Sequence, residues 1–135
     1  AREIVAVARR RLDWLEGKRM PAVVRVRELF DTNQLNEEQI LDAIAWNDEK
    51  FISLALAVRS RILPSLTDII LKSQNPKAVA ALAWKAGISA RGSVTIQKGP
   101  AQIPPHKLLH PKGGSEYALS EAELLWQLEF YGVKL

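Results

Sequence analysis

The sequence contains no cysteine and no long hydrophobic run. The lack of cysteine excludes a disulfide scaffold, a thiolate nucleophile and any cysteine-based zinc or iron–sulfur site. No apolar segment approaches the roughly 20 residues that a membrane helix needs. The first segment, residues 2–16, is interrupted by charges and has no signal-peptide cleavage pattern. We therefore expect a cytoplasmic protein without a membrane partner.

Motifs for enzymatic chemistry are also missing. Gly113-Gly114 is followed by Ser-Glu and not by the Lys-Ser/Thr of a phosphate-binding loop, and no Gly-x-Ser-x-Gly nucleophile elbow occurs. His106 and His110 have a metal-binding spacing, but prolines surround them and the motif lacks a third ligand. We therefore predict no enzymatic activity, no metal and no cofactor. The acidic residues that could form an acid–base pair lie mostly at expected helix N-termini, where negative charge is stabilising anyway: Glu37, Glu38, Asp42, Asp48 and Glu49.

Length and charge suggest a single domain with an uneven surface. The 135 residues are 47% hydrophobic and 25% charged, as in an average globular domain. The net charge is +5 over residues 1–27, −6 over 28–50, +8 over 51–112 and −3 over 113–135. Such blocks favour contacts between parts of the same chain, or partner-facing surfaces of different sign. Because the sequence begins with Ala1 and not with methionine, we also expect it to be a segment of a longer protein.

Two stretches of the chain resemble one another as pairs of short amphipathic helices. Residues 56–70 and 82–96 superimpose at a shift of about 26 residues, a period typical of stacked helical repeats. The pattern predicts an all-α fold of about seven or eight helices, arranged as a short α-solenoid-like stack of antiparallel helix pairs. Helix starts are indicated by Pro21, Asn36, Asp48, Pro64, Asn75-Pro76, Ser89 and Ser120.

We expect one helical-repeat domain over residues 1–135, with three parts. Residues 1–98 form the stacked helices, residues 99–119 a Pro/Gly-rich connector, and residues 120–132 a helix that caps the stack. A cap needs a polar outer face, which the glutamates of the last helix supply. The connector is expected to dock through Ile103, Leu108 and Leu109. Leu56, Leu82 and Leu128 are expected to be nearly fully buried. Apolar residues at helical spacing indicate the first helix, and those of the second follow Pro21: Ile4, Val5, Ala8, Leu12 and Leu15, then Val23, Val24, Val26, Leu29 and Phe30.

Three segments carry a resemblance to a known family. They are the closing stretch from Glu116 to Gly132, the alanine-rich stretch from Ala78 to Arg91, and the step Ile103-Pro104-Pro105 between them. Together they resemble an uncharacterised, mainly alphaproteobacterial domain-of-unknown-function family (DUF 2336). The resemblance implies a HEAT-like or armadillo-like helical domain. It implies no catalytic or ligand-binding residue, because none is established for the family.

Tryptophans and basic residues are the remaining candidates for a binding surface. Trp14, Trp46, Trp84 and Trp126 all fall in predicted helices, where packing between helices explains them most simply. Trp84 is the one that we single out as an exposed anchor, because Lys85 and Arg91 lie near it in sequence. Arg59 and Lys85 are equivalent at the repeat shift and can form a basic ridge. The expected interaction surface comprises Arg59, Arg61, Lys77, Trp84, Lys85 and Arg91.

These features predict a protein-interaction or regulatory module, not an enzyme. Helical-repeat stacks usually act by presenting a surface, and the expected partner is another protein. The alternative is binding to the phosphate backbone of a nucleic acid through a basic face formed by residues 51–112. Such binding would be independent of sequence and sensitive to salt.

Overall fold

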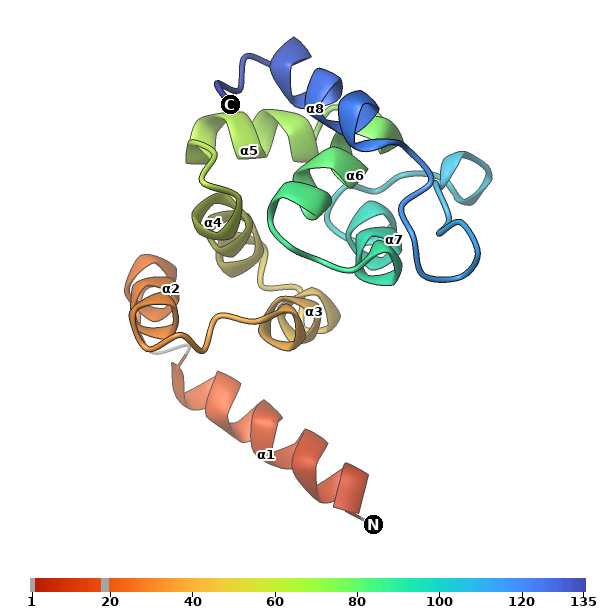
Figure 1. Cartoon of the computed structure of the whole chain (residues 1–135). Coiled ribbons are helices and arrows are strands. Elements are labelled where there is room, and N and C mark those ends of the chain that lie inside the picture. Colours follow the sequence, from red (N-terminus) through yellow and green to blue (C-terminus); the bar gives the residue numbers. More distant parts are fainter. Residues whose placement is uncertain (1, 18–19) are drawn as a thin grey trace.

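The computed structural model describes residues 2–17 and 20–135, and within them the chain is all-α (Figure 1). The described residues contain eight α-helices, one short 3-10 helix and no β-strand. The expected fold class and number of helices are therefore confirmed. No described helix is both long and apolar enough to cross a membrane. The helices are α1 (Arg2–Gly17), α2 (Ala22–Asp31), α3 (Glu37–Ala45), α4 (Glu49–Ser60), α5 (Pro64–Leu71), α6 (Pro76–Lys85), α7 (Ala90–Lys98), η1 (Pro105–Lys107) and α8 (Glu121–Phe130).

Successive helices end in a similar way. After a helix the chain turns through one residue with a positive φ, and such residues recur at intervals of 13 or 14 positions. In α4 and α6 the following amide then closes the turn: the N–H of Ile62 donates to the carbonyl of Ala57 (3.2 Å), and that of Ile88 to Ala83 (3.0 Å). The 26-residue repeat in the sequence thus corresponds to two equivalent helix ends. At the ends of α2 to α6 these residues are Asn33, Asn47, Arg61, Gln74 and Gly87.

The N-termini follow the sequence signals with one exception. Four of the expected caps accept backbone N–H groups, and Ser120 forms a full capping box with Glu123. Asp48 was expected to cap α4 but makes no such bond. Instead it accepts from Nη2 of Arg25 at 2.9 Å, and both side chains are buried. A buried guanidinium requires a counter-charge, and that requirement takes the carboxylate away from the helix end.

Helices α4 and α6 form the centre of the molecule. α4 packs against α2, α3, α5 and α6, and α6 also packs against α5, α7 and α8. Residues 78–83 of α6, four of them alanine, are all buried, so neighbouring helices approach closely. In a linear stack each unit touches only its neighbours. Here α7 packs against α3 as well as α6, so the arrangement is not strictly linear. The solenoid-like order stays a prediction.

The core follows the expected pattern from α4 onward. Leu56, Leu82 and Leu128 are completely buried, as predicted. The other large side chains at the centre come from most of the remaining helices, so one core joins them. They include Ile40, Ile70, Ile96 and Leu124.

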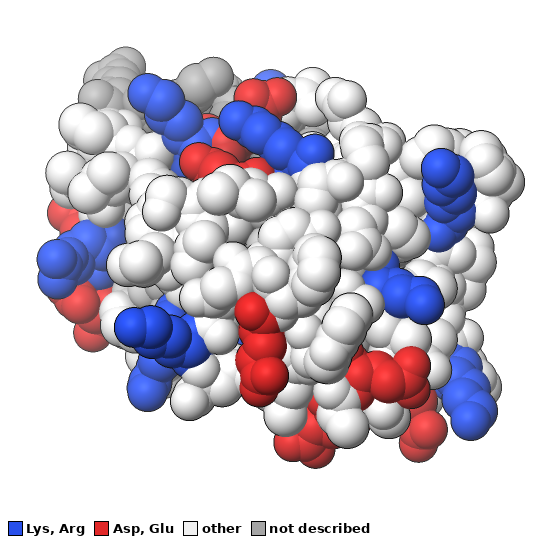
Figure 2. Space-filling model, turned by 90° about the horizontal axis from the view of Figure 1, so that it is seen from above, with Lys and Arg blue, Asp and Glu red and all other residues white. Residues whose placement is uncertain are grey.

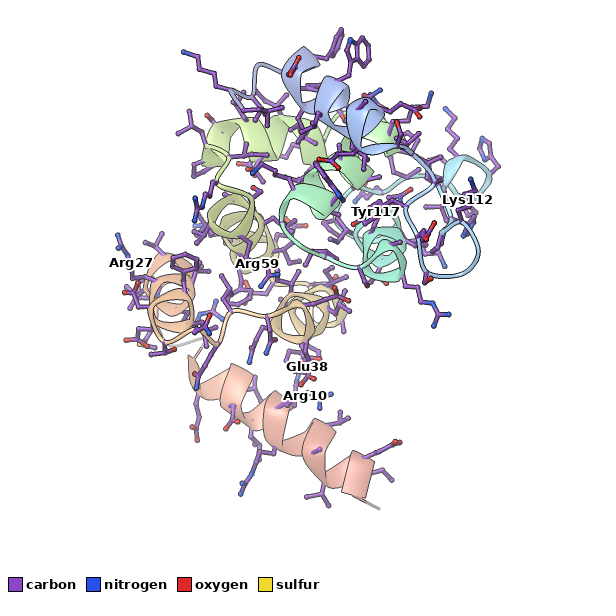
Figure 3. The ribbon with its side chains drawn as sticks, viewed as in Figure 1. Arg10, Arg27, Glu38, Arg59, Lys112 and Tyr117 are labelled. Carbon is purple, nitrogen blue, oxygen red and sulfur yellow. The ribbon has the colours of Figure 1, made fainter. Side chains whose placement is uncertain are left out.

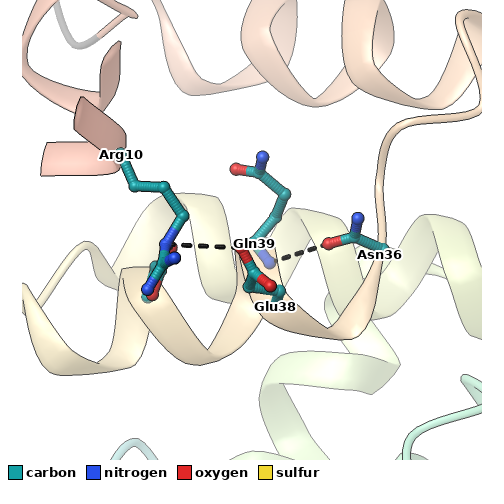
Figure 4. A network of polar contacts seen from close by, with 5 residues as sticks. Arg10, Asn36, Glu38 and Gln39 are labelled. Carbon is teal, nitrogen blue, oxygen red and sulfur yellow. Dashed lines mark hydrogen bonds and ion pairs between the residues drawn. The ribbon is translucent and has the colours of Figure 1, made fainter. Parts of the chain in front are cut away.

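Helix α1 differs from the expectation. The helix is present where the apolar spacing indicated it, but its apolar residues do not pack into the stack: Ile4 is 74% exposed and Leu12 is 61% exposed. Ion pairs join α1 to α3: Nε of Arg10 lies 3.0 Å from Oδ2 of Asp42 and 3.3 Å from Oε1 of Glu38 (Figure 4). A helical period in the sequence shows that a helix has an apolar face, but it does not show what covers that face.

The connector is docked on α7, as expected. The buried amide of Gln97 donates to the carbonyl of Leu109 (3.2 Å) and accepts from its N–H (2.9 Å). Ile103 is buried, whereas Leu108 and Leu109 are half-buried. Farther along, the hydroxyl of Tyr117 donates to the carbonyl of Ile88 at 2.6 Å. Burial raises the pKa of Tyr117, and the nearby Glu37 carboxylate raises it further, by a smaller amount. The hydroxyl therefore keeps the proton that it donates.

Helix α8 covers α6 at the end of the chain (Figure 1). Leu124 and Leu128 are buried, and the side chain of Asn75 donates to Gln127 (3.3 Å) and to the hydroxyl of Tyr131 (3.4 Å). In the capping box, Glu123 accepts hydrogen bonds from the backbone N–H and from the hydroxyl of Ser120. Both bonds lower the pKa of Glu123, and the backbone bond has the larger effect. The outer face of α8 carries the expected glutamates. It also carries two exposed aromatic side chains that a polar cap does not require.

Truncation of Leu82 to alanine should destabilise the domain by about 2–5 kcal/mol, because it removes buried methyl groups and leaves a cavity at the centre of the core. Chemical denaturation followed by circular dichroism measures the loss. Ile69→Ala is the matched control, since Ile69 is 52% exposed on α5 and its truncation should change stability by less than about 1 kcal/mol. Equal losses for the two variants would contradict the position of α6 at the centre.

Deletion of residues 116–135 should unfold or aggregate the domain. The deletion removes Leu124 and Leu128 and leaves the apolar surface of α6 in water. Thermal melting and light scattering test this outcome. A truncated protein that stays monomeric and melts as the full chain does would show that α8 is detachable and not a cap.

Candidate interaction surface

The structure brings three of the six predicted surface residues together. Arg59, Arg61 and Lys85 line one groove of about 280 Å³, formed where the C-terminal ends of α2, α4 and α6 meet. The other lining residues are Phe30, Asn33, Leu35, Val58, Ala86 and Gly87. We call this the basic groove. Its cations lie at helix C-termini, where positive charge offsets the partial negative charge of unpaired carbonyls.

Arg59 has a structural role in this groove. Its Nε donates to the carbonyl of Ala86 at 2.8 Å, its Nη1 to that of Leu35 at 2.5 Å, and its Nη2 to that of Gly87 at 3.5 Å. The guanidinium therefore caps the C-terminus of α6 and joins it to the loop between α2 and α3. Arg59 lies between α4 and α3 in Figure 3. It was expected to form a basic ridge, but its donors are directed at the protein's own backbone.

Gly87 is required by this arrangement. Its φ is +76°, and an added Cβ would lie 3.1 Å from Nη2 of Arg59. A side chain at this position would therefore meet both an unfavourable backbone conformation and the guanidinium. Nothing in the sequence around Gly87 indicates that Arg59 closes over it.

The other three predicted residues lie elsewhere. Lys77 is exposed in the first turn of α6, and Nε of Arg91 donates to the carbonyl of Gly114 in the connector at 2.8 Å.

Trp84 is half-buried against the core, so it is not the exposed indole that was expected. Trp46 is half-buried, with Arg11 over its ring at 5.0 Å, and the side chain of Trp14 lies outside the described residues. Among the three tryptophan side chains that the structure describes, the exposed one is Trp126, at 59%.

A second groove, lined mainly by apolar side chains, runs between α2 and α4. It has a volume of about 330 Å³ and shares Phe30 and Val58 with the basic groove, so the two are continuous. Val23 on its rim is 62% exposed and Phe30 is 49% exposed. The complete lining is Val23, Val26, Arg27, Phe30, Leu54 and Val58. We call this the α2–α4 groove.

The sequence did not reveal the α2–α4 groove, because the apolar residues of a helix do not show which of them stay at the surface. Only Val26 of α2 is buried among the apolar residues predicted there. The sequence did contain a signal for the groove. The apolar side chains of α2 extend around more of the helix surface than α4 alone can cover. Arg27 extends from the outer side of α2 (Figure 3).

Four of the five carboxylates considered for acid–base chemistry make structural contacts. Glu37 accepts from the N–H (2.6 Å) and hydroxyl (2.8 Å) of Ser89 at the start of α7. Glu38 and Asp42 bind Arg10, and Asp48 binds Arg25. His106 and His110 are both exposed in the connector. Among the described residues there is no group of three or more potential metal ligands.

Charges of both signs are distributed around the face seen from above. Figure 2 shows a broad uncharged centre with basic and acidic side chains at its rim, the acidic ones gathered mainly along one edge. The basic side chains on this face do not form a continuous stripe. This face therefore offers no continuous basic surface to a phosphate backbone.

No family model, curated protein or solved structure matches this chain in the comparisons with known proteins. The family resemblance stays a prediction, and the function is argued from the surface alone.

Substitution of Arg59 should separate its structural role from a binding role. Arg59→Met should lower the free energy of unfolding by about 1–3 kcal/mol, because three backbone carbonyls lose a charged donor. The control is Arg61→Met, which alters an exposed cation in the same groove and should change stability by no more than about 0.5 kcal/mol. Denaturant titration of both variants gives the comparison. Similar losses for both would contradict the capping role.

Proposed function

We propose that the chain is a non-enzymatic interaction module that binds a segment of another protein in the α2–α4 groove. The observation that carries the proposal is the continuous groove itself, whose rim exposes Val23 and Phe30 to solvent. Exposed apolar side chains gathered in a concave surface are typical of protein-binding sites. The flanking helices also provide the geometry in which an amphipathic helix lays its apolar face between two others.

The charges along the groove favour an acidic partner. Arg27 lies on the rim of the α2–α4 groove, and Arg61 and Lys85 lie in the adjoining basic groove. No acidic residue is among the described residues that line either groove, whereas Glu49 and Asp68 line the neighbouring hollow beyond Val23. Burial of apolar side chains would supply most of the affinity, while carboxylates beside these cations would orient the bound segment. The proposed partner is therefore an acidic amphipathic helix.

Nucleic-acid binding remains the second candidate, with less support from the geometry. Arg59 donates to backbone carbonyls, which leaves Arg61 and Lys85 as the cations of the basic groove that are not engaged in this way. The apolar side chains of the neighbouring groove offer nothing to a phosphate backbone.

A designed peptide tests the proposed function. The probe is a fluorescent acidic amphipathic peptide of about 16 residues, with leucine and tryptophan on one helical face and glutamate on the other. Its control is a peptide of the same composition in scrambled order. Val23→Glu places a carboxylate on the rim of the groove and should weaken binding at least about tenfold. Ile69→Glu changes an equally exposed residue outside both grooves and should leave binding unchanged.

Fluorescence anisotropy measures these affinities. Binding of a generic DNA duplex, measured in the same way, tests the nucleic-acid alternative. If the peptide fails to bind, or binds equally well to the Val23→Glu variant, the proposed groove is wrong. Duplex binding at low salt that weakens steeply as salt rises, and that Val23→Glu leaves unchanged, would favour the nucleic-acid function instead.

A further inference from the structure

The outer face of α8 carries an ordered aromatic cluster. Trp126 is 59% exposed and Phe130, one turn later, is 68% exposed. Their ring centroids lie 5.7 Å apart, and Phe130 meets the ring of Tyr131 edge-on at 5.3 Å. The hydroxyl of Tyr131 in turn accepts from Asn75 at the start of α6. The cluster is thus held in place before any partner arrives, which lowers the cost of ordering it on binding.

This face is unusual for the terminal unit of a helical stack. Such a unit needs a polar outer surface because no further unit covers it. Glu123 and Glu129 supply polar groups on either side of α8, but the two largest exposed side chains lie between them. Large aromatic side chains, and tryptophan above all, are the residues most enriched in binding hot spots. The outer face of α8 is therefore both acidic and apolar.

The two surfaces of the molecule complement one another. The α2–α4 groove calls for an acidic helix with apolar side chains one turn apart, and α8 presents Trp126 and Phe130 at that spacing between glutamates. Within one molecule the two cannot meet. α8 is fixed to α6 through Leu124 and Leu128, and α4, α5 and α6 lie between α8 and α2 (Figure 1). The groove that matches α8 belongs to a second copy.

We propose that the chain associates head to tail with copies of itself, with α8 of one copy docked in the α2–α4 groove of the next. This inference rests on the proposed function of the groove and names its partner. Trp126 and Phe130 enter the groove beside Val23 and Phe30 of the neighbouring copy. The glutamates of α8 face Arg27 and the cations of the basic groove. Because the two docking surfaces differ, an open assembly keeps one unused groove at one end and one unused α8 at the other, and association continues until a ring closes or the supply of copies ends.

A complementation experiment in the full chain tests the assembly. One variant, Trp126→Ala with Phe130→Ala, removes the aromatic cluster, and Val23→Glu blocks the groove. The wild-type chain should show an average mass that rises with concentration above 15.1 kDa in sedimentation or light scattering. Each variant alone should remain monomeric, with an apparent dissociation constant raised at least about tenfold. A mixture of the two should form a dimer and stop there, because only one intact surface of each kind is present.

Control variants distinguish this assembly from association through a different surface. Ile69→Ala, on neither docking surface, should associate as the wild type does. All substituted positions are exposed, so melting curves should match; if the double variant melts early, Phe130→Ala alone replaces it. Association of Val23→Glu with itself would overturn the proposal in favour of pairing between two α8 faces. A wild-type chain that stays monomeric at every concentration would also overturn it. In that case, binding of the designed peptide that still depends on Val23 would leave the proposed groove intact.

Discussion

Three helix ends in this protein are held at one place by a single guanidinium. Arg59, at the end of α4, donates to the carbonyls of Ala86 and Gly87 directly after α6 and to the carbonyl of Leu35 in the loop after α2. Helix C-termini repel one another through their aligned partial charges, so bringing them together needs a positive group among them. The guanidinium has five donors in a planar fork and can satisfy several carbonyls at once, which a lysine ammonium does less well. The relative positions of α2, α4 and α6 depend on this contact.

The same contact explains why a groove remains open beside it. Arg59 fixes the end of α2 at the loop that carries Leu35, and the buried pair of Arg25 and Asp48 fixes its beginning against the start of α4. With both regions held by polar contacts, α2 buries only Val26 fully among its apolar side chains and leaves Val23 and Phe30 at the surface. The apolar groove thus stays open because polar contacts hold both ends of α2 in place. Closing it by rotation of α2 would break the Arg25–Asp48 pair inside the protein, which is strongly unfavourable.

Local signals in the sequence predicted more than long-range ones. Asn75, Ser89 and Ser120 cap their helices as expected because a cap depends on residues within one turn. Burial of Leu56 and Leu82 followed from their periodicity. The failures are pairings across the chain: Asp48 binds a residue 23 positions away, and Arg59 caps a helix 27 positions away. Composition and spacing do not encode which distant group a charge will meet. For the same reason the basic block over 51–112 could not be divided in advance into structural and free cations.

The last helix of the fold, α8, exposes the indole of Trp126 on its outer face. A helix that closes an apolar core must bury one face, and α8 does so with Leu124 and Leu128. Its opposite face was free to be wholly polar, as the glutamates there show, yet it holds Trp126 and Phe130 in contact with each other. Two exposed rings in contact shield part of each other from water, which lowers but does not remove the cost of their exposure. The groove at α2 complements the area that stays exposed, because it is apolar and bordered by cations. Under the proposed assembly, therefore, the helix that caps one copy is also the segment that fills the open edge of the next, and a single contact covers the apolar area of both surfaces.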